Sequence, residues 1–281
     1  MNRIFETVSF HIVKPCNYSC KFCYATYQTL DNVRQLTLGE SAIILSKLAD
    51  AGVKKVTFAG GEPTLHKDLP EMIKIAKALG LTTGIITNGS LVTLDFFGYV
   101  KDYLDWFGIS IDSFMIGTNL KIGRYHKRDK YGNKAFGIPE YMHIIAQARA
   151  IGCKIKVNTV VNKYNNNEYM GLYINRINAD RWKIFDTLRV SGQNDHQYRS
   201  IKSTDFQAFV DRHSHPNMVV ENNDMMTGSY LLINPRGEFY ENWGEHTRRS
   251  SSLLEYPVEY CLDQINLDRS KFIERGGIYD W

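Results

Sequence analysis

The sequence is short of several residue types and patterns, and each shortage excludes a class of protein. It has only five cysteines among 281 residues, an odd number that does not make the disulfide framework of a small secreted protein. It contains no apolar run near the roughly 18 residues that suggest a membrane span, and its first segment lacks the features of a signal peptide. Its net charge of +4 is too small to indicate nucleic-acid binding by itself. We therefore expect a cytoplasmic protein with neither membrane nor nucleic acid as a partner.

What is present is an ordinary globular composition, arranged as alternating strand and helix patterns. Hydrophobic residues make up 43% of the chain and charged residues 23%, enough for a packed core. Strands are predicted at residues 5–13, 55–60, 82–88, 107–112, 154–162 and 182–190. Helices are predicted at residues 37–52, 69–79, 94–103, 139–151 and 167–178, the first opened by a capping box of Thr37 and Glu40. Six β-α units favour an α/β fold with parallel strands in a partial (βα)6 barrel.

The alternation stops near residue 191. Residues 191–205 are predicted as a loop, 204–213 as a helix, and 229–242 as a hairpin that turns at Pro235 and Gly237. The last residues end on an aromatic side chain, which favours a docked tail over a frayed one. We therefore divide the chain into a barrel of residues 1–191 and a C-terminal extension of residues 192–281 that closes the active site.

Three of the cysteines, Cys16, Cys20 and Cys23, form a C-x3-C-x2-C cluster directly after the first predicted strand. That loop lies at the carboxyl end of the barrel, where barrel enzymes carry their chemistry. Three thiolates suit a cluster of four irons that leaves one iron free to bind a small molecule. The alternative is a structural zinc site, which needs a fourth ligand. His11 is the nearest candidate, with an unfavourable spacing.

The cysteine motif and a glycine motif together resemble the signatures of radical S-adenosylmethionine (radical SAM) enzymes. The first reads CNYSCKFCY at residues 16–24, and the second reads AGGEP at residues 59–63, ending the second predicted strand. The resemblance implies a [4Fe-4S] cluster on the three cysteines, S-adenosylmethionine on the open iron, and a donor such as flavodoxin or ferredoxin. Reductive cleavage would give a 5′-deoxyadenosyl radical. The S-adenosylmethionine contacts that the resemblance implies are Tyr24, Gly60, Gly61, Glu62, Asn88, Ser110 and Arg124.

Cationic side chains occupy the strand faces that should point into the barrel. Alternation places the apolar residues of three predicted strands against the outer helices and the opposite residues in the lumen. The lumen-facing cations are Lys55, Lys156, Arg181 and Lys183. Burying four cations is costly unless an anion accompanies them, and a triphosphate suits this set. The alternative is that Lys55 and Arg181, near strand starts, reach solvent with their charged ends.

With these cations the chain resembles the viperin family of radical SAM enzymes. The similar blocks span nearly the whole chain and include KVNTVVNKYN, RWKIFDTLRVSGQN, GSYLLI and RGG. The resemblance implies an antiviral lyase that removes the ribose 4′ hydrogen of a nucleoside triphosphate (CTP, UTP or GTP) and dehydrates it to the 3′-deoxy-3′,4′-didehydro nucleotide. It implies catalytic Tyr230. The implied substrate contacts are Ser9, His11, Lys55, Thr57, Lys156, Asn158, Arg181, Lys183, Glu221 and Asn223. Ser9 and Thr57 depart from the animal pattern, so the base is left open.

Two other functions compete with this interpretation. One is a different radical SAM enzyme, acting on a peptide or small metabolite and often carrying a second cysteine set. Cys153 and Cys261 are far apart in sequence and are more typical of core thiols. The other is a zinc-dependent nucleic-acid binder, for which the basic run at residues 123–134 is the only candidate surface. We favour the nucleotide enzyme.

Overall fold

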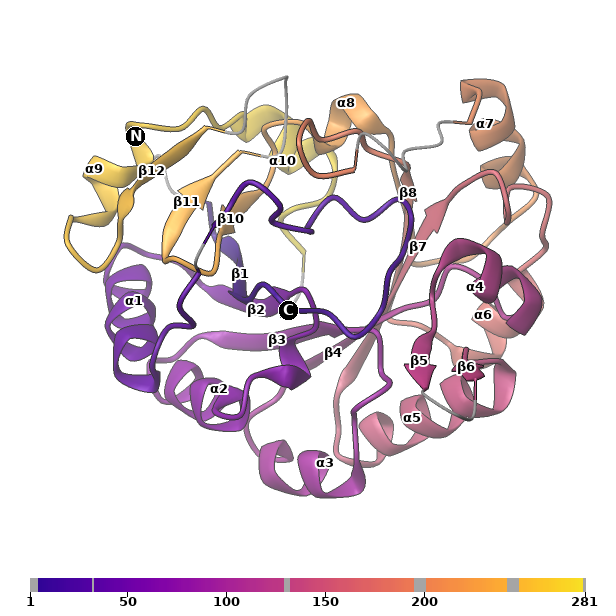
Figure 1. Ribbon diagram of the computed structural model, residues 1–281, viewed down its shortest axis with the longest axis horizontal. Coiled ribbons are helices and arrows are strands. Elements are labelled where there is room, and N and C mark those ends of the chain that lie inside the picture. Colours follow the sequence, from indigo (N-terminus) through magenta and orange to yellow (C-terminus); the bar gives the residue numbers. More distant parts are fainter. Residues whose placement is uncertain (1–4, 32, 129–131, 195–200, 242–247, 280–281) are drawn as a thin grey trace.

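The computed structural model describes residues 5–31, 33–128, 132–194, 201–241 and 248–279. Parts of the predicted loop at 191–205, the basic run, the end of the hairpin and the last two residues of the tail lie outside these ranges. Within them, a ten-stranded sheet has the order β12-β11-β10-β1-β2-β3-β4-β7-β8-β9. Figure 1 shows the sheet curving into an open barrel with helices along its convex side. No helix in the described ranges is both long and apolar enough to cross a membrane.

Six parallel strands form the barrel wall, as predicted. Their bounds are β1 (Thr7–Val13), β2 (Lys55–Gly60), β3 (Thr82–Thr87), β4 (Trp106–Ser110), β7 (Lys154–Val161) and β8 (Arg181–Asp186). The connecting helices are α1 (Leu38–Asp50), α2 (Leu69–Ala78), α3 (Leu94–Val100), α4 (Ile116–Ile122), α5 (Ile138–Ala150) and α6 (Gly171–Ile177). The predicted capping box is present: Thr37 Oγ1 accepts from the Glu40 amide, and Glu40 accepts from the Thr37 amide.

Strand alternation separates a helix-facing apolar surface from a polar lumen. Phe58, Val157 and Trp182 are fully buried in the core beneath the helices. The register places Ser9 beside Thr57 and Asn158 beside Lys183 across neighbouring strands. Polar side chains from distant parts of the sequence therefore share the concave face.

The second half of the chain differs most from the predicted elements. The strand predicted to reach residue 190 ends at Asp186, since the chain bends there and the following segment returns to the cysteine loop. The helix predicted to begin at residue 167 begins at Gly171. Several short elements were not predicted, because their sequences are too short to show a period. They are the 3₁₀ turn Pro63–Leu65, the two-stranded sheet of β5 (His126–Arg128) and β6 (Gly132–Lys134), and the helices α8 (Asn223–Met226), α9 (Val258–Leu262) and α10 (Arg269–Glu274).

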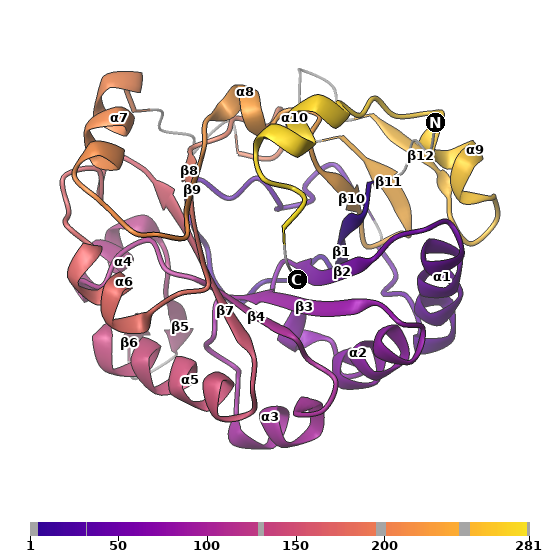
Figure 2. The same ribbon diagram turned by 180° about the vertical axis from the view of Figure 1, so that it is seen from behind.

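Residues after 191 add strands to both edges of the barrel sheet. After α7 (Ser203–Asp211), β9 (Met218–Glu221) pairs in parallel with β8, and β10 (Leu231–Ile233) pairs in parallel with β1. The predicted hairpin is formed by β10 and β11 (Glu238–Tyr240), and β12 (Arg249–Ser252) follows. Figure 2 shows the segment after α10 running into the concave side of the sheet. This part of the chain therefore borders the lumen.

Candidate active site

Two adjoining cavities lie on the concave side of the sheet. The larger, of about 250 Å³, is lined by the cysteine loop and the carboxyl ends of the parallel strands. The smaller, of about 40 Å³, lies near the amino ends of β1, β2 and β8. Ser9, Thr57, Lys156 and Tyr230 line both cavities and so form their boundary. Since barrels of this kind act at the carboxyl ends of their strands, the larger cavity is the candidate active site.

Three free thiols form one side of the larger cavity. Cys16, Cys20 and Cys23 follow β1 directly. The loop closes on itself through a 3.1 Å bond from the Cys23 amide to the Cys20 carbonyl. Burial raises the pKa of Cys16 to about 11 and that of Cys20 to about 12. Metal binding at these thiols would therefore release protons.

The zinc alternative has no support in this geometry. No three of the described His, Cys, Asp and Glu side chains are placed to hold a single metal ion. The Nδ1 atom of His11 is hydrogen-bonded to the Tyr27 hydroxyl, and the ring is not grouped with the thiols around a single metal position. Three thiols spread over one cavity wall fit a cluster of several irons, in which each cysteine binds a different iron.

The segment that follows the cysteines is clamped by the loop after β8. The Thr26 hydroxyl donates to the Gln193 carbonyl at 2.8 Å, and Gln193 Nε2 donates to the Thr29 hydroxyl at 3.0 Å. Asn194 Nδ2 donates to the Phe22 carbonyl at 3.1 Å. These bonds join segments more than 160 residues apart in sequence and fix the cysteine loop against the barrel rim.

The two glycines of the AGGEP motif let the cysteine loop approach the end of β2. The Gly61 amide donates to the Val13 carbonyl at 2.9 Å. A Cβ on Gly61 would lie 2.1 Å from the Pro15 carbonyl oxygen, and one on Gly60 would lie 2.6 Å from that of Val13. Gly60 also has a φ of +151°, which L side chains rarely adopt. Close backbone packing therefore explains both glycines.

Gly61→Ala is expected to displace the cysteine loop, because the new methyl group meets backbone that cannot rotate away. We expect the free energy of unfolding to fall by about 1–3 kcal/mol and iron retention to fall with it, measured by urea unfolding and iron content. Gly98→Ala is the matched control, since Gly98 lies in α3 with nothing within 4 Å of its added Cβ. Equal behaviour of the two variants would contradict the close-approach explanation.

Glu62 is a buried carboxylate held at the end of β2. It is 1% exposed, and its oxygens accept from the Thr64 hydroxyl at 2.6 Å, the Thr87 hydroxyl at 2.6 Å and the Asn88 amide at 2.8 Å. Burial raises its pKa, although these bonds oppose the shift. Asn88 Nδ2 in turn donates to Asn17 at 2.9 Å within the cysteine loop. A carboxylate fixed beside the thiols suits the amino group of a bound amino acid.

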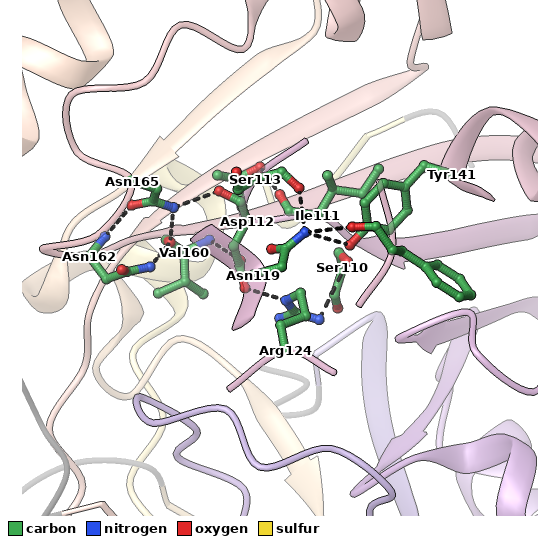
Figure 3. Close-up of polar contacts among 12 residues, drawn as sticks. Ser110, Ile111, Asp112, Ser113, Asn119, Arg124, Tyr141, Val160, Asn162 and Asn165 are labelled. Carbon is green, nitrogen blue, oxygen red and sulfur yellow. Dashed lines mark hydrogen bonds and ion pairs between the residues drawn. The ribbon is translucent and has the colours of Figure 1, made fainter. Parts of the chain in front are cut away.

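Arg124 and Asp112 form a buried ion pair that lines the larger cavity (Figure 3). Arg124 Nε donates to Asp112 Oδ2 at 2.5 Å, and Nη1 donates to the Ser110 carbonyl at 3.4 Å. The side chains are 7% and 1% exposed. The other Asp112 oxygen accepts from the Val160 amide at 2.9 Å. The pair fixes the guanidinium at the rim of the cavity. Asn158 Oδ1, on the same side, is buried without a hydrogen-bond partner among the described residues, so it is free to bind a ligand.

Five cationic side chains surround the smaller cavity. They are Lys55, Lys156, Arg181, Lys183 and Arg275. Lys55 and Arg181 are only 3% and 7% exposed, so the alternative in which they reach solvent is wrong. The Lys55 ammonium donates to the Tyr279 hydroxyl at 2.7 Å, and the Arg181 guanidinium lies 4.0 Å from the Tyr279 ring centre. A cavity so lined favours a polyanion.

One carboxylate, Glu221, lies among these cations. It pairs with Lys183 and is 3.8 Å from Arg275. Burial opposes its ionisation, but the two cations outweigh burial and lower its pKa. The Tyr230 hydroxyl donates to Glu221 at 2.5 Å and accepts from Lys183 at 2.8 Å. The Arg275 guanidinium lies 3.6 Å from the Tyr230 ring centre. Tyr230 is thus held at the cavity boundary by a charged network.

The stability of the nucleotide-free protein is expected to depend on pH through Lys55 and Lys156. Burial, followed by neighbouring cations, lowers their pKa values to about 6 and about 7 from 10.5. The unfolded chain therefore binds more protons above pH 6, and this pair contributes stability that rises with pH. Urea unfolding between pH 6 and 8 measures the slope. In the Lys55→Met, Lys156→Met double variant, the free energy of unfolding should rise less over this pH range. All other titratable groups are the same in the two proteins, so the difference comes from these two lysines. An identical slope would contradict the two lowered pKa values.

Most residues expected at a site line one of the two cavities. Glu221 and Asn223 are the exceptions: Glu221 lies behind Lys183, and Asn223 begins α8, where its amide reaches Asp186 at 3.4 Å. Sequence reasoning missed Asp112, Arg275 and Tyr279 as site residues. Asp112 lies two residues after Ser110, one of the expected contacts. The RGG motif contained the signal for Arg275.

Comparisons with known proteins agree with this geometry. A family model described as the radical SAM superfamily matches residues 12–177. A Lacinutrix mariniflava protein named S-adenosylmethionine-dependent nucleotide dehydratase is 40% identical over 98% of this chain and 58% of its own length. A Flammeovirga pacifica protein of the same name is 37% identical, with 100% of this chain and 97% of that protein covered.

A solved structure shows the same fold. Streptococcus suis SuiB bound to its precursor peptide SuiA has a TM-score of 0.70 at 17% identity, covering 96% of this chain and 66% of that one. The predicted partial barrel and the predicted family are therefore confirmed. The chain belongs to the radical SAM superfamily and, within it, to the family of the S-adenosylmethionine-dependent nucleotide dehydratases.

Proposed function

We propose that the protein dehydrates a nucleoside triphosphate, removing the ribose 4′ hydrogen and releasing water from C3′. The observation that carries the proposal is the adjacency of the two cavities. A wall of three thiols borders one, five cations border the other, and four residues line both. A nucleotide with its phosphates among the cations has its ribose at the shared boundary.

The residues present suit the cofactors of the superfamily. Cys16, Cys20 and Cys23 would hold a [4Fe-4S] cluster, and Glu62 with the backbone of Gly60 would bind the amino group of S-adenosylmethionine. When bound, these groups supply a one-electron cleavage that yields a carbon radical able to abstract hydrogen. The electron comes from a carrier such as flavodoxin or ferredoxin. Five free thiols favour the reducing cytoplasm.

The chain itself contributes position and exclusion of water. The cations fix the triphosphate, so the sugar is held in one orientation during the reaction. After the 4′ hydrogen is removed, loss of the 3′ hydroxyl as water consumes one proton and one further electron. Tyr230, at the boundary and hydrogen-bonded to Lys183 and Glu221, is placed to supply the proton, or both together as a hydrogen atom, and otherwise the electron comes from the same carrier. The extension after residue 191 supplies Tyr230, Arg275 and Tyr279 to the smaller cavity, here called the cation cavity, and so closes it. The product would lack the 3′ hydroxyl that nucleic-acid synthesis requires, as an antiviral chain terminator does.

A peptide substrate is the second candidate, since SuiB was solved with its precursor peptide. The buried cations disfavour a peptide substrate, because a neutral peptide leaves them without a counter-charge.

Anaerobic incubation with reductant, S-adenosylmethionine and each nucleoside triphosphate in turn tests the proposal by mass spectrometry. We expect one nucleotide to lose the mass of water and 5′-deoxyadenosine to gain deuterium from 4′-labelled substrate. Transfer from another position would contradict the assignment.

A further inference from the structure

A buried hydrogen-bonded chain of three aromatic side chains lies against the larger cavity. His11 lines that cavity, two residues after Ser9 on the lumen face of β1. Its Nδ1 is hydrogen-bonded to the Tyr27 hydroxyl, which lies 3.0 Å from the Tyr240 hydroxyl. The three rings meet nearly edge-on, with centres 5.8 to 6.0 Å apart. All three residues are at most 6% exposed. No step described so far uses Tyr27 or Tyr240.

Among the described residues, only one arrangement of the protons gives every hydroxyl donor of this chain an acceptor. The Tyr240 hydroxyl has Tyr27 as its only hydrogen-bond partner among the described residues. It must therefore donate to Tyr27, or its buried proton has no acceptor, which is costly. Tyr27 then donates its own proton to Nδ1 of His11. A neutral imidazole that accepts at Nδ1 carries its proton on Nε2.

Two further observations agree with this arrangement. Burial lowers the pKa of His11 to about 3, so the ring is neutral at physiological pH. Tyr27 has a φ of +54°, a left-handed conformation that is costly for an aromatic residue. Such strain is retained where the surroundings require it and is concentrated at functional sites. The Gln193 clamp on Thr26 and Thr29 holds the backbone on both sides of Tyr27.

We propose that Tyr240 and Tyr27 are positioning residues that fix His11 as the Nε2–H tautomer, and that this N–H donates to a carbonyl of the nucleobase. The inference rests on the proposed function. His11 Nε2 has no hydrogen-bond partner among the described residues, and Ser9 and Thr57 on the same wall connect its position to the cation cavity. Cytosine, uracil and guanine each carry a carbonyl, and adenine does not. A fixed donor therefore selects against ATP.

Equilibrium binding to the resting holoenzyme tests the inference without depending on turnover. Calorimetry without reductant gives the affinity for CTP, UTP, GTP and ATP. Tyr27→Phe removes the hydroxyl that holds the His11 proton on Nε2, so both neutral tautomers become populated. We expect binding of the preferred nucleotide to weaken about 10-fold, and the preference of the protein for that nucleotide over ATP to fall by about the same factor. His11→Gln keeps an amide donor without needing Tyr27, so adding Tyr27→Phe to it should change little. Tyr103→Phe, outside both cavities, is the matched control.

The tautomer has its own measurement. In protein with ¹⁵N-labelled histidine, we expect Nδ1 of His11 to be unprotonated in the wild type and partly protonated in Tyr27→Phe. A protonated Nδ1 in the wild type, as when Tyr240 donates to solvent, overturns the proposal. So does an unchanged base preference in Tyr27→Phe. If nucleotides bind with this preference but none is dehydrated, the proposed function fails while this inference stands.

Discussion

Replacing Cys20 with alanine is expected to abolish iron binding and, with it, all cleavage of S-adenosylmethionine. Cys20 lines the same cavity as the other two thiols, and a cluster of four irons with two protein ligands has lost a third of its protein bonds. We expect about four irons per wild-type chain after anaerobic reconstitution and close to none in Cys20→Ala. Iron analysis and electron paramagnetic resonance measure both.

The chain supplies its own control for this experiment. Cys153 and Cys261 are buried, at 2% and 0% exposure, and line neither cavity. Cys153→Ala and Cys261→Ala should each retain full iron, and each should be less stable than the wild type because a core contact is lost. Iron retained in Cys20→Ala, or zinc found in the wild type in place of iron, would contradict the assignment of the cysteine cluster.

Lys156→Met is expected to weaken nucleotide binding strongly without loss of stability. Lys156 lines both cavities, and its ammonium group makes no hydrogen bond or ion pair to a described residue. A charge-assisted bond to phosphate is worth about 1.5–3 kcal/mol, so binding should weaken roughly 10- to 100-fold. Since the lysine has no partner to leave unpaired, the free energy of unfolding without nucleotide should stay the same or rise. Calorimetry and urea unfolding measure the two effects.

Lys121→Met is the matched control, because Lys121 is exposed on α4. It should bind nucleotide as the wild type does. Lys183→Ala differs from both, since it removes a partner of buried Glu221 and should therefore lose stability as well as affinity. If Lys156→Met loses stability and keeps its affinity, the lysine is structural and the cation cavity is not the phosphate site.

The barrel could be predicted because its signals are local. Alternation placed Lys55, Lys156 and Lys183 on one face and Phe58 and Val157 on the other, and the register of parallel strands brings like faces together. The strands β9 and β12 could not be predicted, because each has four residues and is stabilised by pairing with another strand, β8 or β11. Propensity within so short a segment is too weak to decide.

The site divides in the same way. Cys16, Cys20, Cys23 and Gly61 follow from motifs whose spacing has a chemical or steric reason. The Arg124–Asp112 pair spans 12 residues, and the chain from His11 through Tyr27 to Tyr240 spans 16 and then 213. Each contact depends on how the backbone between its partners folds, and a single sequence contains no sign of it. A role for Glu221 in substrate binding stays a prediction, and its burial behind Lys183 depends on how β9 pairs with β8.

The sheet order has a consequence for synthesis of the chain. β1 is made first, yet its outer edge is covered only by β10, and β8 is covered only by β9. Until residues 218–233 leave the ribosome, both margins of the nascent barrel expose unpaired backbone, the template on which strands of other molecules add. Completion of the fold therefore waits for contacts between segments more than 200 residues apart, which slows folding. Chaperone dependence is expected to end only when the hairpin has docked.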